Sequence, residues 1–284
     1  MNVRYAEVIG DPVAHSKSPL IHQFWLGKLG IAGEYRRTRV TADELPLYLA
    51  TRRVDPDWRG CNLTMPLKRE VVPLLSALDN AAARIGAVNT IVAEGAGPET
   101  GFNTDAEGFL EPLIKVIGEG LGERLAIVVG AGGAGRAIAF ALASAHFEVL
   151  VLNRHPAKAR DLTAAAGGAW WDDLSLYDLT ANQNLVLQGD PGTSLLLVNA
   201  TSLGMVSEPP LDLNLDDVDP RTIVYDIVYS PFETPLLADA RRRGMRTIDG
   251  LAMLIGQAAA AFQHFFGAAA PREHDADLRE LLTR

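Results

Sequence analysis

The stretch LAIVVGAGGAGRAIAFALASAHFEVLVLNR, residues Leu125 to Arg154, decides the fold class of this chain. Leu125–Val129 is a short apolar run of the kind that forms a buried parallel strand, and Glu148–Leu152 is another. Between them, Arg136–Ala145 is rich in alanine and free of proline, which predicts a helix. The order strand, helix, strand is that of a βαβ unit, so we expect an α/β fold with a parallel sheet.

Three glycines mark the turn between the first strand and the helix. Gly130, Gly132 and Gly135 form the pattern G-x-G-x-x-G. Glycines let the backbone approach a pyrophosphate, which then lies among the free N–H groups of the helix N-terminus. In this context the pattern predicts a dinucleotide site, and a glycine-rich turn without a ligand is the weaker alternative.

The residues after the second strand indicate which dinucleotide binds. Asn153 and Arg154 stand where an NAD site usually places Asp or Glu for the ribose hydroxyls. A carboxylate would repel a 2′-phosphate, whereas Arg154 offers a planar fork and Lys158 adds a second positive charge. The stretch therefore predicts NADP. The alternative is that both cations only solvate the start of the next helix.

Two later runs, SLLLVNAT (residues 194–201) and TIVYDIVY (residues 222–229), predict further strands of a doubly wound sheet. Ligands bind beyond the carboxyl ends of such strands. Four side chains are therefore expected near the nicotinamide end of the cofactor: Asn199, Thr201, Asp226 and Tyr229. Asp226 could equally cap a turn.

Composition sets the outer limits. The 284 residues, 48% of them hydrophobic, suffice for two domains, and a net charge of −9 argues against a nucleic-acid partner. The single cysteine, Cys61, excludes an internal disulfide and fits a reducing compartment. The N-terminus shows no signal peptide, and no apolar run approaches the roughly 20 residues of a membrane helix. We expect a cytoplasmic protein.

The first polar cluster is HSKSPLIH, residues 15–22. Ser18 followed by Pro19 has the form of an N-cap and first helical residue. Ser16 and Ser18, with Lys17 between them, are also the groups that would bind a carboxylate. The pattern leaves both interpretations open.

The second cluster is NLTMPLK, residues 62–68, which leads from a strand into a helix. Lys68 falls in the first helical turn, where the helix dipole disfavours a cation. Lys68 is therefore either an ordinary exposed residue or a lysine that loses its proton readily and suits acid–base chemistry.

The third cluster comprises GAVNT (residues 86–90) and GFNTDAEG (residues 101–108), with Asn89, Asn103 and Asp105. Asp105 could cap a helix that begins near Ala106. Alternatively it could pair with Lys68, hold the ammonium group and bind a substrate hydroxyl.

At these residues the chain resembles the shikimate dehydrogenase family. The likeness runs nearly end to end through HSKSP, NLTMPLK, GAVNT, NTDAEG, GAGGAGRA, NR, NATSLGM and DGLAMLIGQAAAAF. Each segment alone is a weak signal, but together, in this order, they are highly specific. The resemblance implies reversible, NADP-dependent reduction of 3-dehydroshikimate to shikimate.

The resemblance also implies residue roles. Lys68 and Asp105 match the catalytic pair of the family. The positions implied for substrate binding are Ser16, Ser18, Asn62, Thr64, Lys68, Asn89, Asp105, Tyr229 and Gln257. Those implied for the cofactor are Gly130, Ala131, Gly132, Gly133, Ala134, Gly135, Asn153, Arg154, Lys158, Thr201 and Gly250. No metal is expected.

The family fold implies two α/β domains. Residues 1–105 and 250–284 would form a substrate domain completed by C-terminal helices, and residues 106–249 a Rossmann-type NADP domain. One departure is His155, which replaces the usual threonine after Asn-Arg.

Three questions stay open from sequence. The quinate-using branch, with its broader substrate and cofactor range, usually places an acid where Arg154 and His155 stand, so it fits less well. A non-catalytic nucleotide-binding regulator is disfavoured by the presence of Lys68 and Asp105. A homodimer is compatible with the sequence, although the scattered aromatic residues mark no dimer face.

Overall fold

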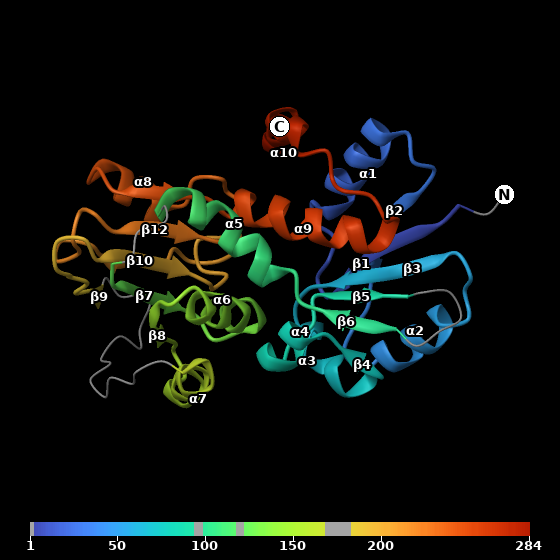
Figure 1. Ribbon diagram of the computed structural model, residues 1–284, viewed down its shortest axis with the longest axis horizontal. Helices are drawn as coiled ribbons and strands as arrows, with labels where there is room; N and C mark the ends of the chain where they lie inside the picture. Colours follow the sequence, from blue (N-terminus) through green and yellow to red (C-terminus); the bar gives the residue numbers. More distant parts are fainter. Residues whose placement is uncertain (1–2, 94–98, 118–121, 168–182) are drawn as a thin grey trace. The chain divides into compact units, whose positions relative to one another are not determined.

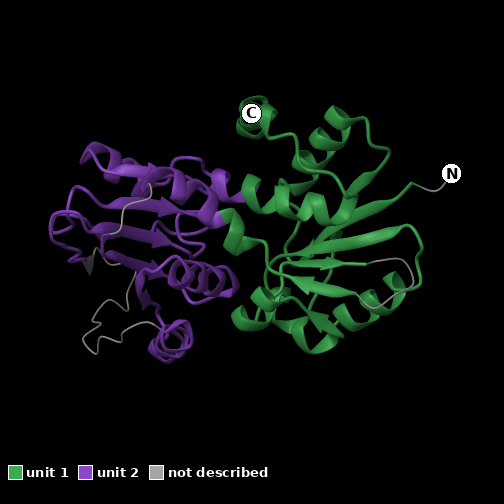
Figure 2. Cartoon of the chain, viewed as in Figure 1, with its two compact units in different colours: residues 1–108, 255–284 green, residues 109–254 purple. Residues whose placement is uncertain are grey.

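Figure 1 shows the computed structural model, which describes residues 3–93, 99–117, 122–167 and 183–284. The chain forms two compact units: residues 1–108 with 255–284 (unit 1), and residues 109–254 (unit 2) (Figure 2). Each contains a sheet with helices, so the predicted α/β class is confirmed. The chain passes between the units twice, within helices α5 (Asp105–Ile117) and α9 (Gly250–Phe266). The assignment of substrate and NADP roles to separate domains stays a prediction.

Unit 1 is built on a mixed six-stranded sheet with the order β2-β1-β3-β5-β6-β4. Its strands are β1 (Tyr5–Gly10), β2 (Glu34–Arg39), β3 (Trp58–Leu63), β4 (Ala77–Leu78), β5 (Thr90–Val92) and β6 (Thr100–Phe102). Strand β1 pairs in parallel with β2 and β3, whereas β5 runs antiparallel to β3 and β6. This register places the end of β3, the start of β5 and the end of β6 side by side. The polar clusters at residues 62–68, 86–90 and 101–108 lie at these three positions.

Apolar side chains on β1 alternate between the two faces of this sheet, as the two-residue period of a strand requires. Tyr5 and Ile9 join one core, while Ala6 and Val8 join another that contains Ala261 of α9. The other helices of unit 1 are α1 (Ser18–Leu29), α2 (Leu45–Arg52), α3 (Leu67–Glu70), α4 (Asn80–Ile85) and α10 (Asp275–Thr283), with 3₁₀ turns at Val72–Leu74 and Arg272–His274.

Unit 2 is built on a five-stranded sheet in which every pair is parallel, with the order β13-β12-β10-β7-β8. These strands are β7 (Arg124–Val129), β8 (Glu148–Leu152), β10 (Ser194–Asn199), β12 (Ile223–Asp226) and β13 (Arg246–Ile248). A two-stranded sheet joins β9 (Gln183–Asn184) to β11 (Leu213–Asn214). The predicted strands at residues 125–129, 148–152, 194–201 and 222–229 are all present, the last two ending earlier than their apolar runs.

Helices α6 (Gly133–Ser144) and α7 (Pro156–Ala166) pack beside β7 and β8, while α8 (Pro235–Arg242) packs beside β12 and β13. From β7 the chain goes to β8 on one side and later returns to β10 on the other. The strand order therefore reverses between β7 and β10, and ligands bind at such a switch point in open parallel sheets.

No helix within the described residues is both long and apolar enough to cross a membrane.

Candidate active site

Lys68 stands at the turn that follows β3. The chain leaves β3 at Leu63 and enters the short helix α3, whose second residue is Lys68. Burial of Leu67 fixes this turn against the core of unit 1, and the Lys68 carbonyl accepts a hydrogen bond from the Val88 N–H at 2.8 Å. The Lys68 side chain is only 17% exposed, so it is not an ordinary surface lysine.

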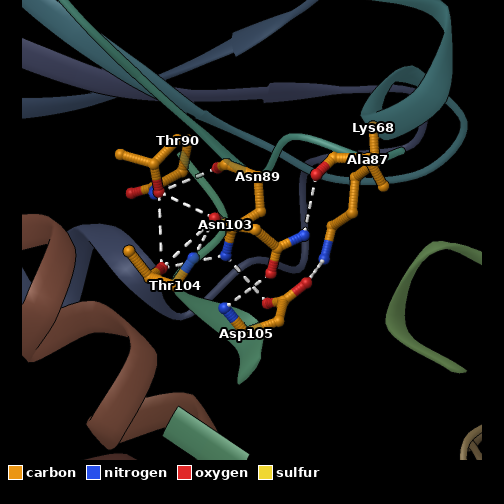
Figure 3. Close-up of polar contacts among 8 residues, drawn as sticks. Lys68, Ala87, Asn89, Thr90, Asn103, Thr104 and Asp105 are labelled. Atoms are coloured by element: carbon orange, nitrogen blue, oxygen red, sulfur yellow. Dashed lines mark hydrogen bonds and ion pairs between the residues drawn. The ribbon is translucent and has the colours of Figure 1, made fainter. Parts of the chain in front are cut away.

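The partner of Lys68 is Asp105, the first residue of α5. Lys68 Nζ lies 2.5 Å from Asp105 Oδ2, and the Asp105 side chain is 6% exposed (Figure 3). The pairing that the sequence left open is therefore confirmed. The Asp105 carboxylate accepts hydrogen bonds from the side chains of Lys68 and Asn89. The Asp105 backbone N–H donates to Asn103 Oδ1 at 3.2 Å. Breaking a buried pair of this kind leaves an uncompensated charge, so the two residues depend on each other.

Asn89 holds the second carboxylate oxygen. Its Nδ2 donates to Asp105 Oδ1 at 2.8 Å, and its Oδ1 accepts from the Thr104 N–H at 2.8 Å (Figure 3). Because a backbone N–H can only donate, the Asn89 amide can face only one way. The carboxylate thus receives a donor on each oxygen, one neutral and one cationic. Such a pair can stabilise charge on a bound oxygen and exchange a proton with it.

The serine cluster lies at the start of α1. Ser18 is the first residue of the helix, and the N-cap position belongs to Lys17 without any side-chain capping bond. The interpretation of Ser18 as an N-cap is therefore wrong, because its backbone is already helical. Instead, Ser16 Oγ accepts from the Ser18 N–H at 3.3 Å and donates to Ser18 Oγ at 3.2 Å. Arg37 supports this turn by donating to the Ser16 carbonyl at 2.9 Å.

The side chain of Lys17, between the two serines, contacts the C-terminal helix. Its Nζ donates to the carbonyl of Leu282 in α10, which ties the C-terminal helix to the serine turn. Ser16 and Ser18 themselves remain a candidate pair of donors for an anionic group.

Helices α5 and α9 approach closely at Gln257. A methyl group on Gly108 would lie 2.3 Å from the Gln257 backbone nitrogen, so only glycine allows this approach. Gln257 is 9% exposed and lies in unit 1, as do Lys68 and Asp105. The sequence pattern that matched Gln257 to a substrate ligand gave no indication of this contact.

In unit 2, the glycine-rich turn lies at the switch point of the sheet. Gly130 has φ +114°, which favours glycine, and a methyl group on Gly135 would lie 2.1 Å from the Gly130 carbonyl oxygen. Helix α6 then begins at Gly133, with Gly132 as a cap that has no side chain to satisfy the free N–H groups. A turn without side chains and a helix N-terminus without a side-chain cap fit a phosphate group, whose oxygens would accept hydrogen bonds from those N–H groups.

Arg154 and Lys158 are exposed at the start of α7. Within the described part of the chain, neither side chain makes an ion pair or hydrogen bond, so both positive charges are available to a ligand. Asn153 Nδ2 donates to the His155 carbonyl at 3.1 Å and shapes the turn that presents Arg154. These are the residues a 2′-phosphate would require.

The carboxyl ends of β10 and β12 are joined by a buried polar network. Asn199 Nδ2 donates to Asp226 Oδ1 at 2.9 Å, and Asn199 Oδ1 accepts from both the N–H and the hydroxyl of Thr201. Asp226 also accepts from Thr234 Oγ1 at 2.6 Å and from the Val228 N–H at 3.0 Å. Burial raises the Asp226 pKa from 3.8 to about 6, although the three hydrogen bonds oppose the rise. Asp226 is thus a structural carboxylate that holds this loop.

Two further predicted positions lie nearby in unit 2. Tyr229, half-buried after β12, has a pKa raised by burial. Gly250 is the first residue of α9. The described residues give Tyr229 no hydrogen-bond partner, so its hydroxyl stays available to a ligand.

Two family models match the chain. Residues 8–91 match the shikimate dehydrogenase substrate binding domain, and residues 250–276 match the shikimate 5′-dehydrogenase C-terminal domain. A curated protein of Sphingopyxis alaskensis, named shikimate dehydrogenase (NADP(+)), is 50% identical over 98% of this chain and 96% of its own length. The chain belongs to the shikimate dehydrogenase family.

Solved structures agree with this membership. Shikimate 5-dehydrogenase from Thermus thermophilus, in complex with NADP(H) and shikimate, is 37% identical, with a TM-score of 0.81 over 98% of this chain and 99% of that one. Quinate dehydrogenase from Corynebacterium glutamicum, in complex with NAD, also reaches 0.81, over 98% of this chain and 99% of that one, but is only 28% identical. The predicted family and the predicted Rossmann-type domain are confirmed, and the chain is an oxidoreductase.

In this family member, two residues of the site are not predicted from the sequence. Thr90 and Thr104 sit inside the quoted motifs GAVNT and NTDAEG, and both bond to Asn89. The signal available was their position beside Asn89 and Asp105 in those motifs. Asn62, matched to the substrate pocket, is 6% exposed and directs its side chain to Tyr35, Thr90 and the Asn89 carbonyl.

Proposed function

We propose that this chain catalyses the reversible, NADP-dependent reduction of 3-dehydroshikimate to shikimate. The observation that carries the proposal is the Lys68–Asp105 pair, 2.5 Å apart and largely withdrawn from solvent. It occurs in a chain that is 50% identical, over nearly its whole length, to a protein named for this activity.

The cofactor fits the groups present in unit 2. Residues 130–135 would receive the pyrophosphate, because their glycines leave the backbone bare. Arg154 and Lys158 would bind the 2′-phosphate, and Asn153 would hydrogen-bond without repelling it. Thr201 and Gly250 are the remaining residues proposed for the cofactor. When bound, NADP supplies or accepts the hydride.

Side chains of the protein carry out the proton transfer. As the ketone of 3-dehydroshikimate is reduced, its oxygen gains negative charge. Lys68 Nζ, held by Asp105, stabilises that charge and gives the oxygen a proton; in oxidation, Lys68 takes the proton back. Asp105 carries the negative charge that keeps the ammonium group in place, and Asn89 keeps Asp105 oriented.

The other substrate contacts are proposed from the same motifs. Ser16 and Ser18 would bind the carboxylate, since their hydroxyls lie side by side at the start of α1. The ring hydroxyls would meet Asn89, Asp105 and Gln257. Asn62, Thr64 and Tyr229 complete the set of residues proposed for the substrate pocket.

Replacing Lys68 with alanine tests the proposal. Lys68→Ala is expected to lower kcat for shikimate oxidation by about 10²–10⁴, the range of a general acid–base group, with a smaller change in KM for shikimate. The measurement is NADPH absorbance at saturating shikimate and NADP. Lys115→Ala is the control, because Lys115 pairs with Glu111 on an exposed face of α5. Near-wild-type turnover by Lys68→Ala would remove Lys68 from the mechanism.

A second candidate is a dehydrogenase that also accepts quinate and NAD. The 28% identity to the quinate dehydrogenase favours it less than the 50% identity to the NADP-dependent protein. Initial rates with both substrates and both cofactors separate the two: shikimate with NADP should dominate. Cofactor binding without turnover of either substrate would indicate a regulator instead.

The proposal includes two further expectations, on the compartment and on the oligomeric state. The chain is expected to act in the cytoplasm, where its single thiol stays reduced. A homodimer stays a prediction, which sedimentation at micromolar concentration would test.

A further inference from the structure

A series of hydrogen bonds with one direction runs through unit 1 from Tyr35 to Asp105. Tyr35 Oη donates to Asn62 Oδ1 at 2.5 Å, and Asn62 Nδ2 donates to Thr90 Oγ1 at 2.9 Å. Thr90 Oγ1 then donates to Asn89 Oδ1 at 2.9 Å. Asn89 Nδ2 donates to Asp105 Oδ1 at 2.8 Å. Each residue passes a donor toward the carboxylate, and we call this series the relay.

The direction of the relay follows from groups that can only accept or only donate. The Asn89 carbonyl can only accept, and Asn62 Nδ2 lies 3.2 Å from it, so Asn62 Oδ1 must face Tyr35. The Tyr35 hydroxyl must therefore donate. At the other end, the Thr104 N–H fixes Asn89 Oδ1 and turns Nδ2 toward Asp105. Reversing the Asn89 amide would lose its bonds to both Asp105 and the Thr104 N–H, and reversing the Asn62 amide would lose its bond to the Asn89 carbonyl.

The relay is shielded from water. Tyr35 is 3% exposed, Asn62 6%, Asn89 2% and Thr90 0%. The Tyr35 ring is also held in place, since it stacks on His22 with the ring centroids 3.9 Å apart and the planes 2° from parallel. Hydrogen bonds in such an interior polarise one another, and they are stronger than the same bonds in water. Phenylalanine at position 35 and valine at position 90 would fill the same space, so packing alone does not require the two hydroxyl groups.

We propose that Tyr35, Asn62 and Thr90 are positioning residues for the Lys68–Asp105 pair. They hold the Asn89 amide in the orientation that occupies one carboxylate oxygen of Asp105 and leaves the other to Lys68. This inference rests on the proposed function and extends its machinery to Tyr35 and Thr90, which are not among the residues proposed for the substrate. Asn62, which is also proposed for the substrate pocket, joins Tyr35 to Thr90 in the relay.

Unit 1 supplies a matched control cluster around Glu7. Tyr48 Oη donates to Glu7 Oε1 at 2.8 Å, and Thr38 Oγ1 donates to Glu7 Oε2. Glu7 is fully buried and pairs with Arg52. This cluster therefore contains one tyrosine and one threonine hydroxyl that serve a carboxylate, as the relay does, but its carboxylate belongs to the core.

The test compares four variants that each remove one hydroxyl: Tyr35→Phe and Thr90→Val in the relay, Tyr48→Phe and Thr38→Val in the control cluster. Loss of one hydrogen bond is expected to lower kcat about 5- to 10-fold in the relay variants. Thr90→Val should be affected at least as strongly, because Thr90 bonds directly to Asn89. The KM for NADP should stay within about twofold in all four.

Thermal unfolding separates positioning from stability. All four variants are expected to lower Tm, since each removes one hydrogen-bond donor from a buried polar partner. Only the relay variants should lose kcat when assayed well below Tm. An unchanged kcat in Tyr35→Phe and Thr90→Val would overturn the proposal, as would an equal loss in Tyr48→Phe and Thr38→Val.

A double-mutant cycle tests the relay without catalysis. Tyr35→Phe and Asp105→Asn should lower Tm by amounts that do not add, whereas Tyr48→Phe and Asp105→Asn should add. Lys68→Met replaces Asp105→Asn if the latter does not fold. If the wild-type protein turns over neither shikimate nor quinate, the proposed function fails, and this cycle alone decides: additive effects with Tyr35→Phe would overturn the relay.

Discussion

Arg154 shows how a single charge can select a cofactor. It is exposed at the start of α7, and Asn153 rather than a carboxylate precedes it. A guanidinium group forms two parallel hydrogen bonds with phosphate, but has no comparable partner on a ribose hydroxyl. The discrimination between NADP and NAD should therefore depend on this side chain.

Arg154→Ala is expected to raise the KM for NADP about 10- to 100-fold, because a hydrogen bond to a charged group contributes roughly 1.5–3 kcal/mol. The KM for NAD should change little. Steady-state kinetics with each cofactor at saturating shikimate measure both. Arg160→Ala, within α7 itself, is the control. An unchanged ratio of the two KM values would mean that Arg154 only solvates the helix.

At this scale, sequence predicted the residues that carry charge. Lys68 and Asp105 stand in motifs whose chemistry is visible, and their pairing was one of two stated alternatives. The role of Tyr35 could not be predicted from sequence, because it depends on a hydrogen bond to Asn62, 27 positions later in the chain. The N-cap role of Ser18 was a misreading of a general signal, since Ser-Pro also fits the first two residues of a helix.

Among the elements, helices α5 and α9 cross so closely that Gly108 has no room for a side chain. Asp105 begins α5, Gln257 lies in the middle of α9, and Gly108 is the point where the two backbones meet. One extra methyl group here would meet backbone atoms, which cannot rotate away as a side chain can. The spacing between a proposed catalytic residue and a proposed substrate ligand thus depends on a glycine.

Gly108→Ala is expected to lower the free energy of unfolding by about 1–3 kcal/mol, the usual cost of overpacking, and to raise the KM for shikimate. Thermal unfolding and kinetics at fixed NADP provide the measurements. The matched control is Gly27→Ala in α1, where a methyl group would meet nothing within 4 Å. That variant should be neutral or more stable by up to about 1 kcal/mol. Equal effects of the two substitutions would contradict the close contact.

Sequence predicted elements of unit 2 better than those of unit 1. Strand β8 has the predicted bounds, and β7 differs by one residue. Helix α6 begins at Gly133 rather than Arg136, because the glycines after Gly132 already adopt helical backbone geometry. In unit 1, β4 is only two residues long and pairs with β6, which no local pattern encodes. In unit 2, strands alternate with helices, and this pattern is visible in short stretches of sequence. In the mixed sheet of unit 1, pairing depends on strands that lie far apart in the sequence.

For the molecule as a whole, acid acts in opposite directions on the two units. In unit 1, complete burial lowers the His22 pKa from 6.5 to about 3, so stability is lost as pH falls through that interval. In unit 2, the Asp226 pKa is raised from 3.8 to about 6. The folded state then binds a proton that the unfolded state releases, so unit 2 gains stability as pH falls from about 6 to about 4.

Asp226→Asn isolates the second effect. Asparagine resembles the protonated acid, so at pH 8 the variant is expected to be more stable than the wild type, by at most about 3 kcal/mol for a shift of about two pKa units. The difference should shrink between pH 6 and pH 4, as the wild-type carboxyl takes up its proton. Chemical denaturation at several pH values measures it. A difference independent of pH would show that Asp226 ionises in the folded protein as it does in the unfolded chain.

The division of the chain into a continuous unit 2 and an interrupted unit 1 has a consequence for synthesis on the ribosome. All residues of unit 2 have been added before residue 255, whereas unit 1 then still lacks its residues 255–284. The missing part includes Ala261 and Phe265, which cover one face of the first sheet, and Leu282, whose carbonyl binds Lys17. Unit 1 is therefore begun before unit 2 and completed after it, and its apolar face stays uncovered while the nascent chain is still tethered to the ribosome.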